Sequence, residues 1–308
     1  MLNPVDTPMT LFSPRLDEHV LMDLVESYRI DASRQLDSAS RSQLGQFLTP
    51  ADIATFMASL FTSTSHSQPL HILDAGAGVG SLAAALIDRF CRLEEVPAEI
   101  QATLYEIDPH MVSYLRGTLA ACAARCEQAG TRLSAEIVEG DFIVEAAQYL
   151  GGYMFSAARD RAYSHAILNP PYKKLPSTSP HREHLSQIGI ETTNLYSAFV
   201  SLAIHLLRPG GELVAIVPRS FCNGPYFRSF RTLFGSEMAL RRIHVFNTRT
   251  QAFKEDGVLQ ENVIVHAVKR GEPSTVLLSS SSDATFEDIT VVEREIEQVI
   301  DPDDPNLF

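Results

Sequence analysis

The stretch ILDAGAGVGSL, residues 72–82, decides the fold of this chain. Its apolar start predicts a short buried strand, and its glycines predict a tight turn where backbone can approach a ligand closely. The apolar run LAAALI, residues 82–87, predicts that a helix follows. The spacing differs from that of dinucleotide-binding turns, because Gly80 comes two residues after Gly78, and no Gly-Lys-Ser/Thr of a phosphate-binding loop follows. Strand, turn and helix in this order indicate an open α/β sheet with its chemistry at the carboxyl ends of the strands.

Acidic residues stand at the ends of three predicted strands. Asp74 ends the first strand, where a carboxylate disfavours a phosphate ligand and suits a cationic one. The second strand ends near Glu106, at a place where a carboxylate typically takes a ribose diol. The third ends in Asp141 and Phe142, which could hold the amino group and the face of an adenine. A single carboxylate would more often cap a helix, but three in succession are hard to explain by capping.

The fourth predicted strand, the apolar run at residues 166–168, leads directly into Asn169-Pro170-Pro171-Tyr172. The two prolines fix two φ angles and remove two N–H donors, and they push Asn169 out of the helical region. The amide oxygen of Asn169 and the carbonyl of Pro170 can then accept both N–H bonds of an exocyclic amine, while the ring of Tyr172 stacks on its face. An isolated motif of this kind would usually only end a strand; the glycine turn and the three carboxylates favour a functional role here.

In this order, the motifs resemble those of class I S-adenosylmethionine-dependent methyltransferases. The closest resemblance is to DNA adenine-N6 methyltransferases of the gamma arrangement, which occur in bacterial restriction–modification systems. The family's amino-terminal motif has a counterpart at residues 44–57, where Thr49 and Pro50 are also predicted to be the N-cap and the first residue of a helix. The match extends to about Lys269. The resemblance implies a Rossmann-like mixed seven-stranded sheet with helices on both faces. It also implies S-adenosylmethionine as cofactor, and an adenine flipped out of DNA as substrate.

The resemblance assigns a role to individual residues. Catalysis falls to Asn169, Pro170, Pro171 and Tyr172, and stacking on the substrate base falls to Tyr172 and Phe253, for which Phe246 is a nearby alternative. Cofactor binding falls to Phe47, Thr49, Pro50, Asp74, Ala75, Gly76, Gly78, Gly80, Glu106, Ile107, Asp141, Phe142 and Asn169.

Other functions share part of this pattern. Glutamine methyltransferases that act on release factors and RNA guanine-N2 methyltransferases also use Asn-Pro-Pro-Tyr, and a catalytically idle cofactor-binding subunit would retain the fold. The counterpart of the amino-terminal motif and Phe253 favour DNA. Enzymes that methylate cytosine N4 usually carry serine in place of Asn169, so that chemistry is disfavoured.

The expected domain organisation has three parts. Residues 1–43 form an amino-terminal tail and a helix that packs on the catalytic domain, and residues 44–270 form the catalytic domain. Residues 271–308 are an acidic linker or docking element, too short for a target-recognition domain, so we expect recognition to come from the rest of a longer enzyme or from a partner subunit. The net charge of −13 agrees with this, because a chain that grips DNA alone should carry a basic face. Residues 173–191 are expected to form an irregular loop that can approach phosphate.

The composition fits a cytoplasmic bacterial enzyme. The sequence has no apolar run long enough to span a bilayer and no recognisable signal peptide. The four cysteines lack the spacing of a metal site and are expected to be buried thiols. His181 and His184 lack a third ligand nearby in the sequence, so no metal is expected.

Overall fold

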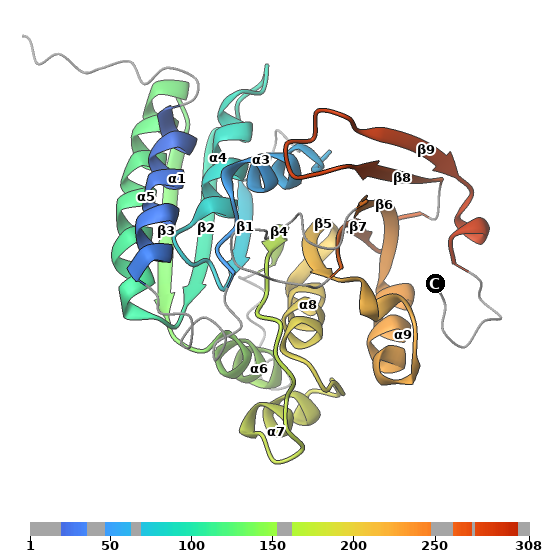
Figure 1. Ribbon diagram of the computed structural model, residues 1–308. Helices are drawn as coiled ribbons and strands as arrows, with labels where there is room; N and C mark the ends of the chain where they lie inside the picture. Colours follow the sequence, from blue (N-terminus) through green and yellow to red (C-terminus); the bar gives the residue numbers. More distant parts are fainter. Residues whose placement is uncertain are drawn as a thin grey trace, which may run out of the picture.

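The computed structural model describes residues 20–35, 47–62, 69–152, 162–247, 261–272 and 275–300. The strands found there are β1 (Leu70–Ala75), β2 (Glu99–Glu106), β3 (Arg132–Glu139), β4 (Tyr163–Leu168), β5 (Leu207–Pro218), β6 (Met238–Phe246), β7 (Asn262–Lys269), β8 (Val276–Ser281) and β9 (Thr290–Arg294). In these ranges they form one nine-stranded sheet in the order β3-β2-β1-β4-β5-β7-β6-β8-β9 (Figure 1).

The first seven strands build the expected mixed sheet. Strands β1 to β5 run parallel to one another, and β7 runs antiparallel between β5 and β6. Strands β8 and β9 extend this sheet, β8 parallel to β6 and β9 antiparallel to β8. The expected seven-stranded sheet was therefore too small, because residues 276–281 and 290–294 add two strands where a linker or docking element was expected. The acidic residues of this segment and its short β-branched runs conceal its strand pattern.

Helices cover both faces of the sheet. On one side lie α1 (Val20–Gln35), α3 (Ala51–Ser59), α4 (Ser81–Cys91) and α5 (Pro109–Ala129). On the other lie α6 (Phe142–Gly152), α8 (Leu195–Leu206) and α9 (Arg228–Glu237), with α7 (Pro180–Gln187) packed on α6. Short 3-10 turns occupy Arg219–Cys222, Pro225–Phe227 and Ile296–Gln298.

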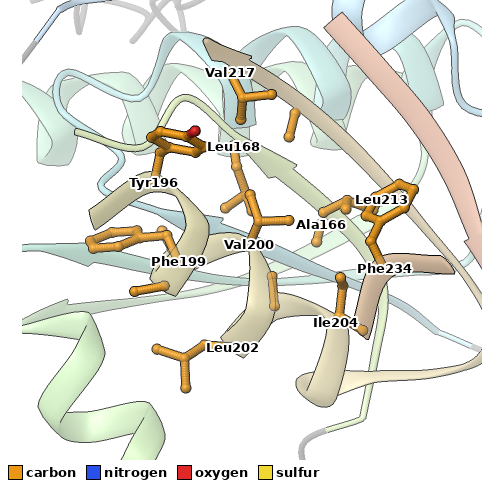
Figure 2. Packing of buried hydrophobic residues seen from close by; sticks show 14 of the residues in the cluster. Ala166, Leu168, Tyr196, Phe199, Val200, Leu202, Ile204, Leu213, Val217 and Phe234 are labelled. Atoms are coloured by element: carbon orange, nitrogen blue, oxygen red, sulfur yellow. The ribbon is translucent and has the colours of Figure 1, made fainter. Parts of the chain in front are cut away.

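The two faces have separate apolar cores. Neighbouring strand side chains point to opposite faces, so Ile72 joins the core beneath α4 while Leu73 joins the core beneath α8. Figure 2 shows the second core, in which Val200 and Ile204 of α8 lie over the side chains of the sheet, including Leu213. Because both faces are covered, the central parallel strands are largely buried; β4 is buried at all six of its residues, Ser164 and His165 included.

Two local predictions need correction. The segment 173–191 is not an irregular loop throughout, because α7 forms within it, with Pro180 in its first turn and Leu185 fully buried. Thr49 does not cap α3, which begins at Ala51 with Pro50 before it. Among the described helices, none is long and apolar enough to cross a membrane.

Candidate active site

A cavity of about 250 Å³ lies where the carboxyl ends of β1 to β4 meet. The chain order reverses between the neighbouring strands β1 and β4, and open α/β sheets bind ligands at such a reversal. Nine of the residues predicted for the site line this cavity: Phe47, Gly76, Gly78, Glu106, Ile107, Asp141, Phe142, Asn169 and Pro171.

The glycine turn after β1 forms one wall of the cavity. Gly76 and Gly78 have φ values of 75° and 57°, in the left-handed region that favours glycine. A Cβ atom on Gly78 would come within 2.9 Å of the Leu48 side chain. The amide of Gly78 donates a 2.7 Å hydrogen bond to Glu106 Oε2, which joins the turn to the end of β2. The turn is therefore fixed in shape, with its backbone bare toward the cavity.

Glu106 is a buried carboxylate that still reaches the cavity. It is 3% exposed, and its Oε1 accepts a 2.8 Å hydrogen bond from the amide of Asp108. Burial raises the pKa of Glu106, while the bonds from Asp108 and Gly78 act in the opposite direction. The carboxylate lines the cavity with these backbone bonds in place, so a ligand hydroxyl can donate to it.

Asp74 lies behind the cavity wall, although the sequence predicted that it binds the cofactor. Its side chain is fully buried, and its Oδ2 accepts a 3.1 Å hydrogen bond from the amide of Ala83 in the first turn of α4. Burial raises the pKa of Asp74 to about 7, and its Oδ1 has no hydrogen-bond partner. Asp74 thus holds the start of α4 against the glycine turn. Gly80 has a similar place, since a Cβ atom there would lie 2.7 Å from Leu115 of α5.

Ala75 and Pro50 also stay outside the wall of the main cavity, and Ala75 is fully buried. Thr49 lines a small recess beside the main cavity, together with Gly76 and Asn169.

The amide of Asn169 is held in one orientation. Its Nδ2 donates to the carbonyl oxygen of Phe47 at 2.8 Å and to Oγ1 of Thr49 at 2.9 Å. Because a carbonyl only accepts, the nitrogen of Asn169 must face Phe47, and Oδ1 must face the other way. Phe47 and Thr49, predicted to contact the cofactor, therefore also orient the predicted catalytic amide.

Tyr172 packs between the two apolar cores beside Asn169. Its hydroxyl lies 3.1 Å from Asn169 Oδ1 and 3.2 Å from the carbonyl oxygen of Ile216, so it can donate to either. The centre of its ring is 5.8 Å from that of Phe47 and 6.3 Å from that of Tyr196. Burial raises the pKa of Tyr172, which keeps the hydroxyl protonated as a donor.

The end of β3 forms the opposite wall. Asp141 Oδ1 accepts a 2.9 Å hydrogen bond from the amide of Ile143, so Asp141 caps α6 as the simplest interpretation of an aspartate there suggests. Its Oδ2 lies 2.7 Å from Nε2 of His181, and both residues line the cavity. The ring of Phe142 packs against Tyr105 and Phe199, with centres 4.9 and 5.0 Å away.

Several cavity residues were not predicted. Lys173 and His181 belong to the segment thought to be irregular, while Leu195 and Phe199 lie four residues apart on one face of α8. The others are Leu48, Tyr105, Met111, Gly140 and Ile143. The face of α8 that meets the cavity depends on packing against the sheet, which the sequence does not show.

Phe253 lies outside the described residues. Its alternative, Phe246, is 8% exposed and packs 5.9 Å from the ring of Phe286, so it belongs to the core. In the part of the chain that the structure describes, no group of three or more His, Cys, Asp or Glu side chains could hold a metal ion.

The fold is that of the class I S-adenosylmethionine-dependent methyltransferases. A solved structure of a putative enzyme of this class from Listeria monocytogenes superposes with a TM-score of 0.63, covering 88% of this chain and 75% of that one at 15% identity. A modification subunit of a putative type I restriction enzyme from Vibrio vulnificus also gives a TM-score of 0.63, covering 86% of this chain and 52% of that one at 15% identity. These likenesses confirm the predicted fold class.

Sequence comparison narrows the class. Residues 128–253 match the family model described as Eco57I restriction-modification methylase. The chain is 43% identical to the type II methyltransferase M.PstI of Providencia stuartii, over 92% of this chain and 55% of the relative. It is 41% identical to M.BsuBI of Bacillus subtilis, over 94% of this chain and 56% of the relative. The chain is therefore a relative of the restriction–modification methylases, as its motifs indicated, and it spans just over half the length of these two relatives.

A more distant relative is named as an RNA methyltransferase. A tRNA1(Val) (adenine(37)-N6)-methyltransferase of Porphyromonas gingivalis is 31% identical over 50% of this chain and 51% of its own length.

Proposed function

We propose that this chain carries the catalytic centre of a DNA adenine-N6 methyltransferase of a restriction–modification system, with S-adenosylmethionine as cofactor. The observation that carries the proposal is the fixed amide of Asn169. Its nitrogen is bound by Phe47 and Thr49, so its oxygen is presented as an acceptor beside the cavity. An acceptor on a stiff Pro-Pro loop suits an exocyclic amine, and the similarity to type II methyltransferases supports DNA.

The cavity fits the proposed cofactor. Glu106 and Asp141 supply carboxylate acceptors for hydroxyl and amino groups, and between them Ile107 and Phe142 supply apolar surface for an adenine. Gly76 and Gly78 bring bare backbone into the cavity wall, and a Cβ atom on Gly78 would clash with Leu48. Two carboxylates in the wall disfavour a phosphate ligand. S-adenosylmethionine, when bound, supplies an electrophilic methyl group.

The chain's own residues prepare the nucleophile. Oδ1 of Asn169 accepts one N–H of the adenine amine, and the carbonyl of Pro170 accepts the other. Both bonds draw the nitrogen toward tetrahedral geometry and free its lone pair from the aromatic ring. The hydroxyl of Tyr172 can turn to Ile216 and leave Oδ1 to the substrate. Catalysis then rests on orientation and preorganised acceptors.

An adenine in duplex DNA must leave the base stack to reach Asn169, which costs about a few kcal/mol. Stacking on Tyr172, and on Phe253 from the other side, would offset this cost. With a net charge of −13, the chain is poorly suited to grip DNA by phosphate contacts alone. We therefore assign sequence recognition to a further domain or a partner subunit, and the catalytic function to residues 44–270 with β8 and β9 appended.

The test is methyl transfer to genomic DNA that lacks N6-methyladenine, followed by nucleoside mass spectrometry, with tRNA as a parallel substrate. We expect N6-methyladenine in DNA and loss of turnover by at least about 10²-fold in Asn169→Ala, with cofactor affinity retained. The tRNA arm is included because of the similarity to the Porphyromonas gingivalis enzyme.

Each other outcome overturns one part of the proposal. N6-methyladenine found in tRNA alone would mean that the substrate is RNA and not DNA. N4-methylcytosine would mean that the methylated base is cytosine and not adenine. Cofactor binding without transfer to any nucleic acid, with the recognition domain or partner subunit supplied, would favour a glutamine methyltransferase or an idle cofactor-binding subunit.

A further inference from the structure

His181 brings an imidazole to the carboxylate at the end of β3. Its Nε2 lies 2.7 Å from Asp141 Oδ2, and the two side chains are 30% and 28% exposed. Both line the cavity, yet they come from different elements, α7 and the loop before α6. Because an ionised carboxylate only accepts, Nε2 of His181 must carry the proton of this bond.

The helix that carries His181 is anchored independently of this contact. Leu185, one turn further along α7, is fully buried in the core shared with α6. The segment is also closed at its ends, where the amide of Leu175 donates to the carbonyl of Thr193 at 2.7 Å and the amide of Leu195 donates to that of Lys173 at 2.8 Å. His181 is thus presented to the cavity from a braced element.

The two oxygens of Asp141 have different duties. Oδ1 is taken by the amides at the start of α6, with Ile143 at 2.9 Å and Val144 at 3.4 Å. Oδ2 is the oxygen left for a ligand, and its bond to His181 adds a second restraint on the carboxylate plane and determines which lone pair of Oδ2 stays free. One bond from His181 still leaves Oδ2 a lone pair for a ligand N–H.

We propose that His181 is a positioning residue for the adenine end of the cofactor. Its imidazole holds Oδ2 of Asp141 so that the free lone pair meets the 6-amino group of the adenine. The proposal rests on the proposed function, because it takes the cavity to be the cofactor site. It also gives the segment after the Asn-Pro-Pro-Tyr motif a direct part in recognition of the cofactor.

The experiment is calorimetric titration with two ligands that need no turnover. S-adenosylhomocysteine carries the 6-amino group, and S-inosylhomocysteine has a carbonyl oxygen in its place. We expect His181→Ala to weaken binding of the adenosyl ligand about tenfold, within the range for hydrogen bonds to charged groups, and to change binding of the inosyl ligand far less. His181→Gln, which can present an N–H to Asp141, should recover much of the loss.

The control is His184→Ala, since His184 lies on the same helix and outside the cavity wall, and it should bind both ligands as the unchanged protein does. Asp141→Asn should weaken binding of the adenosyl ligand. Adding His181→Ala to Asp141→Asn should reduce the affinity little further, because the two residues act as a unit. Thermal unfolding of each variant checks that α7 remains folded, and His181→Gln serves if His181→Ala does not fold.

Two results would overturn the inference. An equal loss for both ligands in His181→Ala would mean that the imidazole only fills space, and unchanged affinity would mean that it has no part in binding. Failure of the unchanged protein to bind S-adenosylhomocysteine is a different result, because it would overturn the proposed function itself.

Discussion

Two buried glutamates of the same sheet have opposite surroundings. Glu106, at the carboxyl end of β2, is 3% exposed, accepts hydrogen bonds from two backbone amides and lines the cavity. Glu212, inside β5, is fully buried, and its Oε2 accepts a 2.6 Å hydrogen bond from His266 and a 2.9 Å bond from the amide of Thr62, just beyond α3. Burial is nearly the same in the two places.

The difference lies in what remains free on each carboxylate. Around Glu212, partners from β7 and from the end of α3 close on the oxygens, so the group ties elements together. Around Glu106, the partners are backbone amides of the loops beside the cavity, and the carboxylate still lines space that a ligand can fill. Buried carboxylates at a sheet therefore mark a binding site only where their remaining lone pairs face a cavity.

The largest expected effect concerns Glu212, the carboxylate that this comparison assigns to stability. Glu212→Ala leaves His266 buried without its acceptor and removes buried methylene groups from β5, which together should lower the free energy of unfolding by about 3–5 kcal/mol. Urea denaturation measures the loss. Glu99→Ala is the control, because Glu99 pairs with Arg132 at the surface and its removal should have little effect. If Glu212→Ala had normal stability but bound S-adenosylhomocysteine more weakly, Glu212 would be a binding residue and not a structural one.

Asp74 offers a second structural carboxylate, with a pH signature. Burial raises its pKa from 3.8 to about 7 in the folded protein, so the protonated form is favoured by folding. Its stabilising contribution is full below pH 4 and is lost as the pH rises toward 7 and beyond, a change of up to about 4 kcal/mol at about 1.4 kcal/mol per pH unit.

Asp74→Asn removes this titration. Unfolding free energies of the two proteins, measured by urea denaturation from pH 4 to 8, should therefore converge or cross in favour of the variant as the pH rises. Parallel curves would show that Asp74 has an ordinary pKa in the folded state.

The binding half of the comparison depends on Glu106. Glu106→Ala removes the proposed ribose acceptor. It should weaken the binding of S-adenosylhomocysteine by about 1.5–3 kcal/mol, the range for hydrogen bonds to charged groups. Calorimetry measures the change. Glu139→Ala is the control, since Glu139 ends the neighbouring strand β3 and pairs with Arg116 at the surface. Unchanged affinity in Glu106→Ala would remove this carboxylate from the site.

The parts of the site that could be predicted are those set by local backbone rules. Gly76 and Gly78 need positive φ, and the prolines after Asn169 fix their own backbone, so their place at strand ends followed from a few neighbouring residues. The mixed sheet with helices on both faces followed from the same motifs through the family resemblance.

What could not be predicted depends on contacts between distant segments. Asp74 and Glu106 both stand at the end of a predicted strand, so the sequence does not distinguish them. In the structure Asp74 is buried against the start of α4, whereas Glu106 lines the cavity. His181 reaches Asp141 across 40 residues of chain, and no short-range signal in its polar surroundings indicates that contact. Strand β8 was missed for the same reason, because its partner β6 lies more than 30 residues earlier in the chain, and β9 pairs in turn with β8.

The smallest expected effect concerns how firmly the predicted catalytic amide is held. Thr49→Val removes one of the two acceptors for Nδ2 of Asn169 and keeps the carbonyl of Phe47. A neutral hydrogen bond contributes about 0.5–1.5 kcal/mol, so turnover in the proposed methylation should fall by between about twofold and about tenfold. Thr49→Ser retains a hydroxyl and should stay near the unchanged rate. Because the amide acts on the substrate amine, affinity for S-adenosylhomocysteine should change less than turnover. Steady-state kinetics with calorimetry on the same samples separates the two quantities, and a Thr49→Val variant that lost only affinity would place Thr49 with the cofactor-binding residues and not with the residues that orient Asn169.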